Sequence, residues 1–123
     1  MPDTLNGNAA LISKRISLAV VARSPIEPVV DFAHRRGWNA LNILSSSENS
    51  FQRDYFGQTD DGSQMPMANV FVKDDGAVHH FWGSEMLYAE LDGQPRHADL
   101  LWPLWNAFDL TPTGRGSDWY PSI

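Results

Sequence analysis

Residues 16–44 read ISLAVVARSPIEPVVDFAHRRGWNALNIL, in which two short apolar runs flank an amphipathic segment. The β-branched run 16–22 predicts a buried strand, and residues 41–44 predict a second one. Between them, apolar side chains recur at helical spacing on one face, at Ile26, Val29, Val30 and Ala33. A strand, a helix and a strand joined by short connections form a βαβ unit, which predicts parallel strands and a right-handed crossover.

The two ends of the central helix carry capping signals. Ser24 and Glu27 have the spacing of a capping box, and Pro25 suits the first helical position. Gly37 follows three basic residues and predicts the end of the helix.

The rest of the chain predicts shorter elements. A short helix is expected within residues 5–14, and a helical turn within 50–56. Residues 68–72 and 77–82 predict a hairpin around Asp75-Gly76. Residues 83–94 are expected to be irregular.

A last helix is expected to begin near residue 100, with Asp99 as its cap and Pro103 in its first turn. One face of that helix carries Leu101, Leu104, Trp105 and Phe108. Residues 109–123 predict an extended C-terminal tail.

Length and composition favour one domain over residues 1–123, because 42% of the 123 residues are apolar. The net charge of −6 disfavours binding to nucleic acids or to anionic membranes, both of which need a basic face. No apolar run approaches the roughly 20 residues of a membrane span, and the first fifteen residues lack a signal pattern. A cytoplasmic location is therefore expected.

The order of these elements resembles the C-terminal portion of the thioredoxin fold. In that fold a cis-proline opens the strand after a long loop, and residues 65–72, MPMANVFV, are similar to that segment. The resemblance implies an α/β, thioredoxin-like domain truncated at its N-terminus, with a cis Met65–Pro66 bond.

The last forty residues resemble an uncharacterised bacterial family of thioredoxin-like proteins, described as predicted dithiol–disulfide oxidoreductases. The likeness rests on motifs such as HFWGSE at 80–85, LWPLWN at 101–106 and DWYP at 118–121. Family members carry an upstream strand and a cysteine motif at the start of the next helix. Here residues 5–7 resemble the far end of that helix, and the chain contains no cysteine.

The absence of cysteine excludes thiol catalysis, disulfides and thiolate metal sites within this chain. The first hypothesis is therefore a non-catalytic, thioredoxin-like module that acts in binding or assembly. The alternative is a fragment of a dithiol–disulfide oxidoreductase whose cysteine motif lies upstream. A third hypothesis is a small-molecule binding protein with an aromatic groove.

The missing central strand would leave backbone groups unpaired on the strands at 16–22 and 68–72. This predicts a homo-oligomer, most simply a two-fold dimer that pairs through exposed strand edges. The other outcome is direct antiparallel pairing of these two strands.

In thioredoxin-like proteins the cis-proline loop lines the substrate groove, so the resemblance implies a groove for a peptide or a small molecule. Its candidate residues are Met65, Pro66, His80, Trp82, Glu85, Trp102 and Trp105. The competing interpretation is that the tryptophans pack the core. No metal or other cofactor is expected, because His79 and His80 point to opposite faces of a strand. Ser45–Ser47, Asp54 and His80 lack the nucleophile elbow of a hydrolase.

Overall fold

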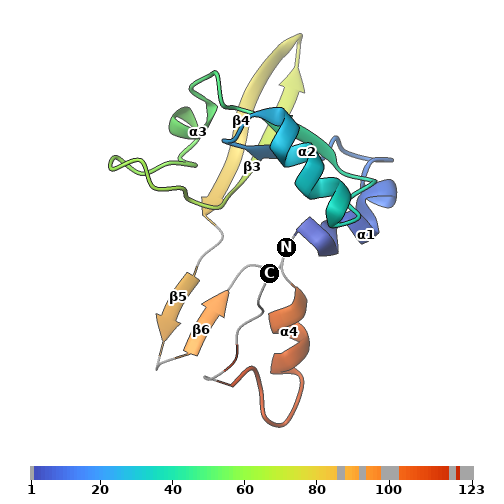
Figure 1. The fold of residues 1–123 in the computed structure, drawn as a ribbon, viewed down its shortest axis with the longest axis vertical. Helices are drawn as coiled ribbons and strands as arrows, with labels where there is room; N and C mark the ends of the chain where they lie inside the picture. Colours follow the sequence, from blue (N-terminus) through green and yellow to red (C-terminus); the bar gives the residue numbers. More distant parts are fainter. Residues whose placement is uncertain (1, 86–87, 92–93, 98–102, 117–118, 120–123) are drawn as a thin grey trace. The chain divides into compact units, whose positions relative to one another are not determined.

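The computed structural model describes residues 2–85, 88–91, 94–97, 103–116 and 119 (Figure 1). The fold is mixed α/β and falls into two compact units, residues 1–67 and 68–123. The described strands form three separate two-stranded sheets. In these sheets the strand near 16–22 does not pair with the strand near 68–72, which was one of the two expected outcomes. None of the helices in this described part of the chain has the length and apolar character that a membrane crossing requires.

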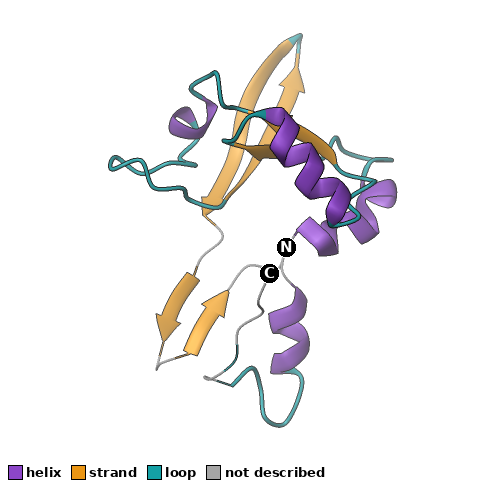
Figure 2. Ribbon diagram, in the orientation of Figure 1, coloured by secondary structure: helices purple, strands orange, loops and turns teal. Residues whose placement is uncertain are grey.

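The first unit contains the expected βαβ sequence (Figure 2). Strand β1 (Ala19–Ala22) pairs in parallel with β2 (Asn42–Ser45), and Val20 lies opposite Ile43. Helix α2 (Ile26–Arg35) connects them. The prediction of parallel strands is confirmed, although β1 begins three residues later than the apolar run.

The N-terminus of α2 differs from the predicted capping box. Pro25 is the N-cap residue, with φ −50° and ψ 152°, and no side chain caps the helix. Because the extended Pro25 separates Ser24 from the first turn, Ser24 is one residue too far from the cap position. Its carbonyl oxygen instead accepts a 2.7 Å hydrogen bond from the Ser45 hydroxyl.

The C-terminus of α2 ends at Gly37 as predicted. Gly37 has φ +71°, and its N–H donates to the His34 carbonyl at 3.0 Å. The Trp38 N–H donates to the Ala33 carbonyl at 2.9 Å. These two bonds form a Schellman motif, in which glycine takes the left-handed position. The motif places the Trp38 ring edge-on to Phe32, with centroids 5.5 Å apart.

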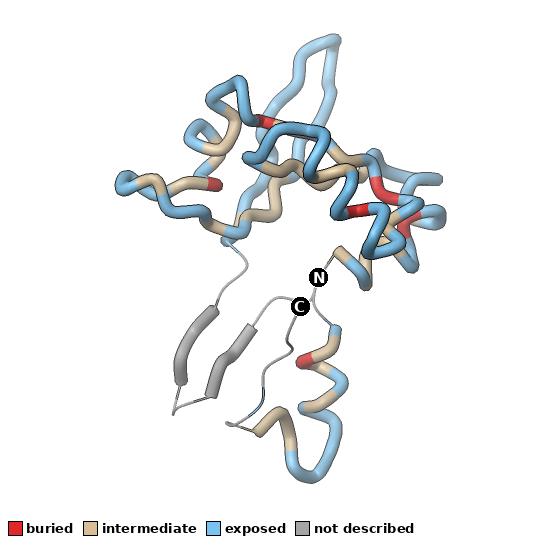
Figure 3. The backbone as a smooth tube through the Cα atoms, in the orientation of Figure 1, coloured by how far each residue is buried: buried red, intermediate tan, exposed pale blue. Residues whose placement is uncertain are grey.

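Helix α1 (Pro2–Ile12) begins three residues earlier than predicted and is tied to the connection after α2. The Asn6 side chain donates to the Gly37 carbonyl and accepts from the Ala40 N–H. These bonds help to explain why a helix forms despite the weak propensity of residues 6–8. Among the described residues of this unit, the buried apolar ones are Ala9, Ala33 and Leu41. Figure 3 draws buried parts of the backbone in red.

Asp3 completes the junction between α1 and the end of α2. Its carboxylate accepts hydrogen bonds from Arg36 Nη2 and Trp38 Nε1, each at 2.9 Å. The hydrogen bond from Arg36, followed by that from Trp38, lowers the pKa of Asp3 below its ordinary value. The ionised form is therefore favoured in the folded state.

We expect Asp3→Asn to lower the free energy of unfolding at pH 7 by about 1 kcal/mol, because both side chains of the ion pair are substantially exposed. A depressed pKa stabilises above the unfolded value, and that contribution disappears as the pH falls through the folded value. Urea unfolding at pH 7 and near pH 3 should therefore show the difference at pH 7 and a smaller one in acid. An equal difference at both pH values would contradict this role.

A β-hairpin opens the second unit, with β3 (Met67–Asp74) and β4 (Ala77–Glu85) joined by Asp75 and Gly76. Both turn residues have positive φ, 46° and 82°, which is the pattern of a type I′ turn. The predicted hairpin is confirmed, and both strands are longer than the sequence indicated.

The predicted cis-proline is wrong, because no peptide bond in the described residues is cis and Met65–Pro66 is among them. Trans is the intrinsically favoured isomer of an X–Pro bond, by about 0.5–1 kcal/mol. The Met65 N–H donates to the Gly57 carbonyl at 3.0 Å. This backbone hydrogen bond holds the residue before Pro66 while the Met65–Pro66 bond is trans.

The prediction that residues 83–94 are irregular is wrong in part. Strand β5 (Tyr88–Leu91) pairs antiparallel with β6 (Gln94–His97), and Ala89 lies opposite Arg96. The two residues between these strands read Asp-Gly, a common sequence signal for a hairpin. That signal predicts the second hairpin once the short runs on either side are accepted as strands.

Helix α4 (Pro103–Asp109) starts at Pro103, consistent with proline in the first turn. The predicted cap Asp99 and the face residue Leu101 lie outside the described residues. Trp105 is fully buried, and its ring meets those of Phe108 and Trp119 edge-on at 6.0 and 6.2 Å.

The described part of the predicted tail is not extended. Residues 112–115 form a turn, and Arg115 returns to make an ion pair with Asp109. The Arg115 guanidinium also lies 5.3 Å from the Trp105 ring centroid. These aromatic and charged contacts hold the chain after α4 against that helix.

Candidate functional site

The hairpin β3–β4 exposes an unusual number of large apolar side chains. We call this set the hairpin surface; it consists of Val70, Phe71, Val72, Val78, Phe81 and Trp82, which are 36% to 74% exposed. Isolated exposed apolar residues are normal, but a contiguous group on one small element marks an interaction site.

The hairpin surface covers both faces of the sheet. The ring of Phe71 lies 5.1 Å from that of His80, so these two residues share one face. Because side chains alternate along a strand, Val70 and Val72 lie on the opposite face. Each face therefore carries exposed apolar side chains, where one face of an antiparallel sheet is usually polar and solvated.

His80 lies on the same face as Phe71. Its Nε2 atom lies 2.9 Å from Asn69 Oδ1 in a hydrogen bond across the two strands. The bond fixes the ring next to Phe71 and presents a polar group within an apolar surface. Such a group gives a contact surface directional specificity in addition to its buried area.

The residues predicted to line a groove are distributed over both units. Met65 and Pro66 precede β3, whereas His80, Trp82 and Glu85 lie on β4. Trp105 is fully buried within its own aromatic cluster, and Trp102 lies outside the described residues. The groove stays a prediction.

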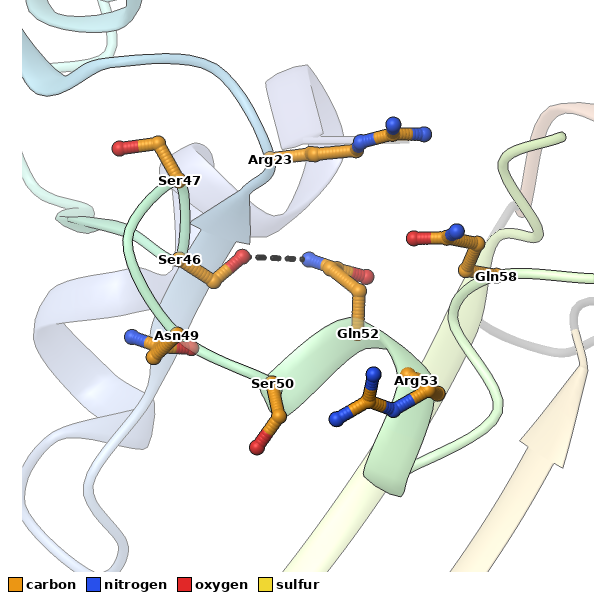
Figure 4. A pocket seen from close by; sticks show the side chains of 8 residues that line it. All are labelled: Arg23, Ser46, Ser47, Asn49, Ser50, Gln52, Arg53 and Gln58. Carbon is orange, nitrogen blue, oxygen red and sulfur yellow. Dashed lines mark hydrogen bonds between the residues drawn. The ribbon is translucent and has the colours of Figure 1, made fainter. Parts of the chain in front are cut away.

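A polar cavity of about 130 Å³ lies in the first unit, at the carboxyl ends of β1 and β2 (Figure 4). Arg23 directly follows β1, and Ser46 directly follows β2. The other lining residues come from the following loop and α3 (Phe51–Asp54), and they are Ser47, Asn49, Ser50, Gln52, Arg53 and Gln58. We call this cavity the serine-loop pocket.

Ser46 anchors the serine-loop pocket and is only 3% exposed. Its N–H and its hydroxyl both donate to the Ala22 carbonyl, at 2.8 and 3.2 Å. Gln52 Nε2 donates to the Ser46 hydroxyl at 3.0 Å, the bond drawn in Figure 4. The end of β1, the end of β2 and helix α3 are therefore joined by a single serine side chain.

Sequence reasoning did not identify this pocket. It weighed Ser45–Ser47 only as part of a hydrolase set with Asp54 and His80, but Asp54 accepts a hydrogen bond from Ser50, and His80 bonds Asn69 in the other unit. The signal that could have found it is the predicted βαβ unit itself, because ligands of α/β sheets bind beyond the carboxyl ends of parallel strands.

The described residues contain no cluster of three or more His, Cys, Asp or Glu side chains placed to hold a metal ion. The chemistry open to the two candidate regions therefore differs. The hairpin surface offers apolar area and strand edges, whereas the serine-loop pocket offers hydrogen-bond donors and positive charge.

A family model described as a bacterial protein of unknown function (DUF899) matches residues 1–123, and the chain belongs to that family. No curated protein and no solved structure matches the chain.

Proposed function

We propose that this DUF899 member is a non-catalytic, thioredoxin-like module that acts by assembling with a second copy of itself through the β3–β4 hairpin. The observation that carries the proposal is the hairpin surface, which exposes apolar side chains on both faces of a two-stranded sheet. The order of a parallel βαβ unit, a hairpin and a helix supports the thioredoxin-like part of the proposal.

The energetics of a lone hairpin favour assembly. A single two-stranded hairpin is at best marginally stable in water, and three or more strands with a covered apolar face are needed for stability. Each strand of the β3–β4 sheet also has one edge with no neighbouring strand in the described sheet. Such an edge pairs readily with another chain. A second copy would extend the sheet and cover apolar area in one step.

Sedimentation equilibrium of the full chain tests this assembly. We expect a dimer at micromolar concentration, and we expect Phe81→Glu to raise the dimer dissociation constant at least about thirtyfold, as loss of an interface hot spot does. The matched control is Leu110→Glu, which adds the same charge at a residue that is 89% exposed outside the hairpin.

Three outcomes would contradict the proposal. The first is a wild-type mass of 13.8 kDa at tens of micromolar. The second is equal weakening by the two substitutions. The third is a Phe81→Glu protein that is still a dimer. Far-UV circular dichroism of both variants separates lost association from lost folding.

The motifs at 80–85 and 101–106 support a second candidate function, because they resemble the family described as predicted dithiol–disulfide oxidoreductases. In that case the natural product carries an upstream cysteine motif, and residues 1–123 form part of a larger enzyme. Intact mass and thiol titration of the protein from its natural source test this candidate. A mass of 13.8 kDa with no titratable thiol would exclude it.

A further inference from the structure

The serine-loop pocket is positively charged within an acidic chain. The chain carries a net charge of −6, yet the pocket lining contains Arg23 and Arg53 and no aspartate or glutamate. Guanidinium groups remain protonated at all physiological pH values, so this local charge is permanent. A polar cavity with fixed positive charge attracts anions.

Of the two arginines, Arg23 has the charge that is less compensated by a neighbouring carboxylate. Its Nη1 atom donates to the Gly62 carbonyl at 2.7 Å, which holds the side chain across the loop. In the part of the chain that the structure describes, no carboxylate pairs with Arg23. A guanidinium has five N–H donors, and a single carbonyl contact leaves most of them for a ligand.

Arg53 contributes a partly compensated charge. Its Nε atom lies 3.7 Å from Asp54 Oδ1, and the two side chains are 77% and 50% exposed. A long contact between exposed groups contributes little stability and is easily exchanged for a stronger partner. The Asp54 carboxylate also accepts a hydrogen bond from the Ser50 hydroxyl, so Asp54 keeps a partner if Arg53 turns away.

Neutral amide donors complete the pocket, because Gln52 Nε2 donates one of its two N–H groups to the Ser46 hydroxyl and keeps the other. Asn49 accepts a 3.0 Å bond from the Phe51 N–H through Oδ1, which leaves its amide N–H groups for other acceptors. The cavity of about 130 Å³ has room for more than one water molecule, so a small polar ligand of a few heavy atoms can enter it.

We propose that the serine-loop pocket binds a phosphate group, either as inorganic phosphate or as the phosphate of a small ester, with Arg23 as the main cationic contact. Arginine suits phosphate because its planar donors pair with two oxygens at once. The location agrees with the general rule that α/β units bind ligands beyond the carboxyl ends of parallel strands. The site lies in the first unit and does not depend on the assembly proposed for the hairpin.

Isothermal titration at low ionic strength tests the site, with inorganic phosphate and glycerol 3-phosphate as separate probes. We expect saturable binding of one phosphate group per chain. We expect Arg23→Gln to weaken it at least about tenfold, because a charge-assisted hydrogen bond to phosphate is lost. Arg15→Gln is the matched control, since it removes the same charge from the same unit outside the pocket.

Tighter binding of glycerol 3-phosphate would identify an ester as the ligand type, and tighter binding of inorganic phosphate would identify the free ion. Sodium chloride at matched ionic strength measures simple charge screening. The proposal is overturned if chloride competes as well as phosphate, if the two arginine variants bind equally, or if no saturable heat appears with folded wild-type protein.

A second variant tests the pocket without removing a charge. A Cβ atom at Gly57 would clash with the Gln52 Oε1 atom, so Gly57→Ala must displace the Gln52 side chain and its bond to Ser46. We expect Gly57→Ala to weaken phosphate binding with the arginines intact. Unchanged binding would show that the position of the Gln52 side chain does not matter for phosphate binding.

Discussion

Replacing Trp105 with alanine should lower the stability of the second unit by about 3–5 kcal/mol, which is the cost of removing a fully buried aromatic side chain. Trp105 is the largest side chain that the described structure buries completely. Phe108, Trp119 and Arg115 all contact its ring, so its loss removes the common partner of three side chains. A small domain has only about 5–15 kcal/mol in total, and a unit of this size lies at the low end.

Amide hydrogen exchange is the appropriate measurement, because it reports each unit separately within the full chain. We expect Trp105→Ala to abolish protection in α4 and to leave α2 protected. Leu110→Ala is the matched control: Leu110 is 89% exposed, and its truncation should change stability by less than about 0.5 kcal/mol. Persistent protection of α4 in the Trp105 variant would show that the aromatic cluster is not the core of this unit.

The sequence predicted local structure better than tertiary contacts. Periodicity and turn residues are local, so they were sufficient for the parallel β1–β2 pair, for Gly37 and for the Asp75-Gly76 turn. The predicted tail failed because Arg115 and Trp119 contact α4 through tertiary interactions, which no local pattern reports. Trans Met65–Pro66 shows a different limit, since the resemblance to a family outweighed the intrinsic preference of the bond.

The candidate sites were harder to predict for the same reason. The aromatic residues suggested a groove, but Trp105 is buried and Trp82 belongs to an exposed hairpin, so one residue type serves two roles. The serine-loop pocket depends on the parallel register that places the ends of β1 and β2 side by side. Residue types alone do not reveal that Arg23 and Ser46 line one cavity.

The same substitution should have opposite effects at two glycines. A Cβ atom at Gly37 or at Gly7 would meet no other atom within 4 Å, so surrounding residues block neither site. Gly37 has φ +71°, where a side chain on an L-residue costs roughly 1–2 kcal/mol. Gly7 lies in the middle of α1, where alanine is favoured over glycine by about 1 kcal/mol.

We therefore expect Gly37→Ala to destabilise the first unit and Gly7→Ala to stabilise it, a difference of about 2–3 kcal/mol in urea unfolding. Gly37→Asn should cost less than Gly37→Ala, because asparagine tolerates the left-handed region. Loss of the Schellman motif would also move Trp38, whose indole N–H bonds Asp3. The intrinsic tryptophan fluorescence, to which Trp38 contributes as one of five tryptophans, should therefore change in Gly37→Ala and not in Gly7→Ala. Equal effects at the two glycines would mean that the end of α2 does not depend on the backbone conformation of Gly37.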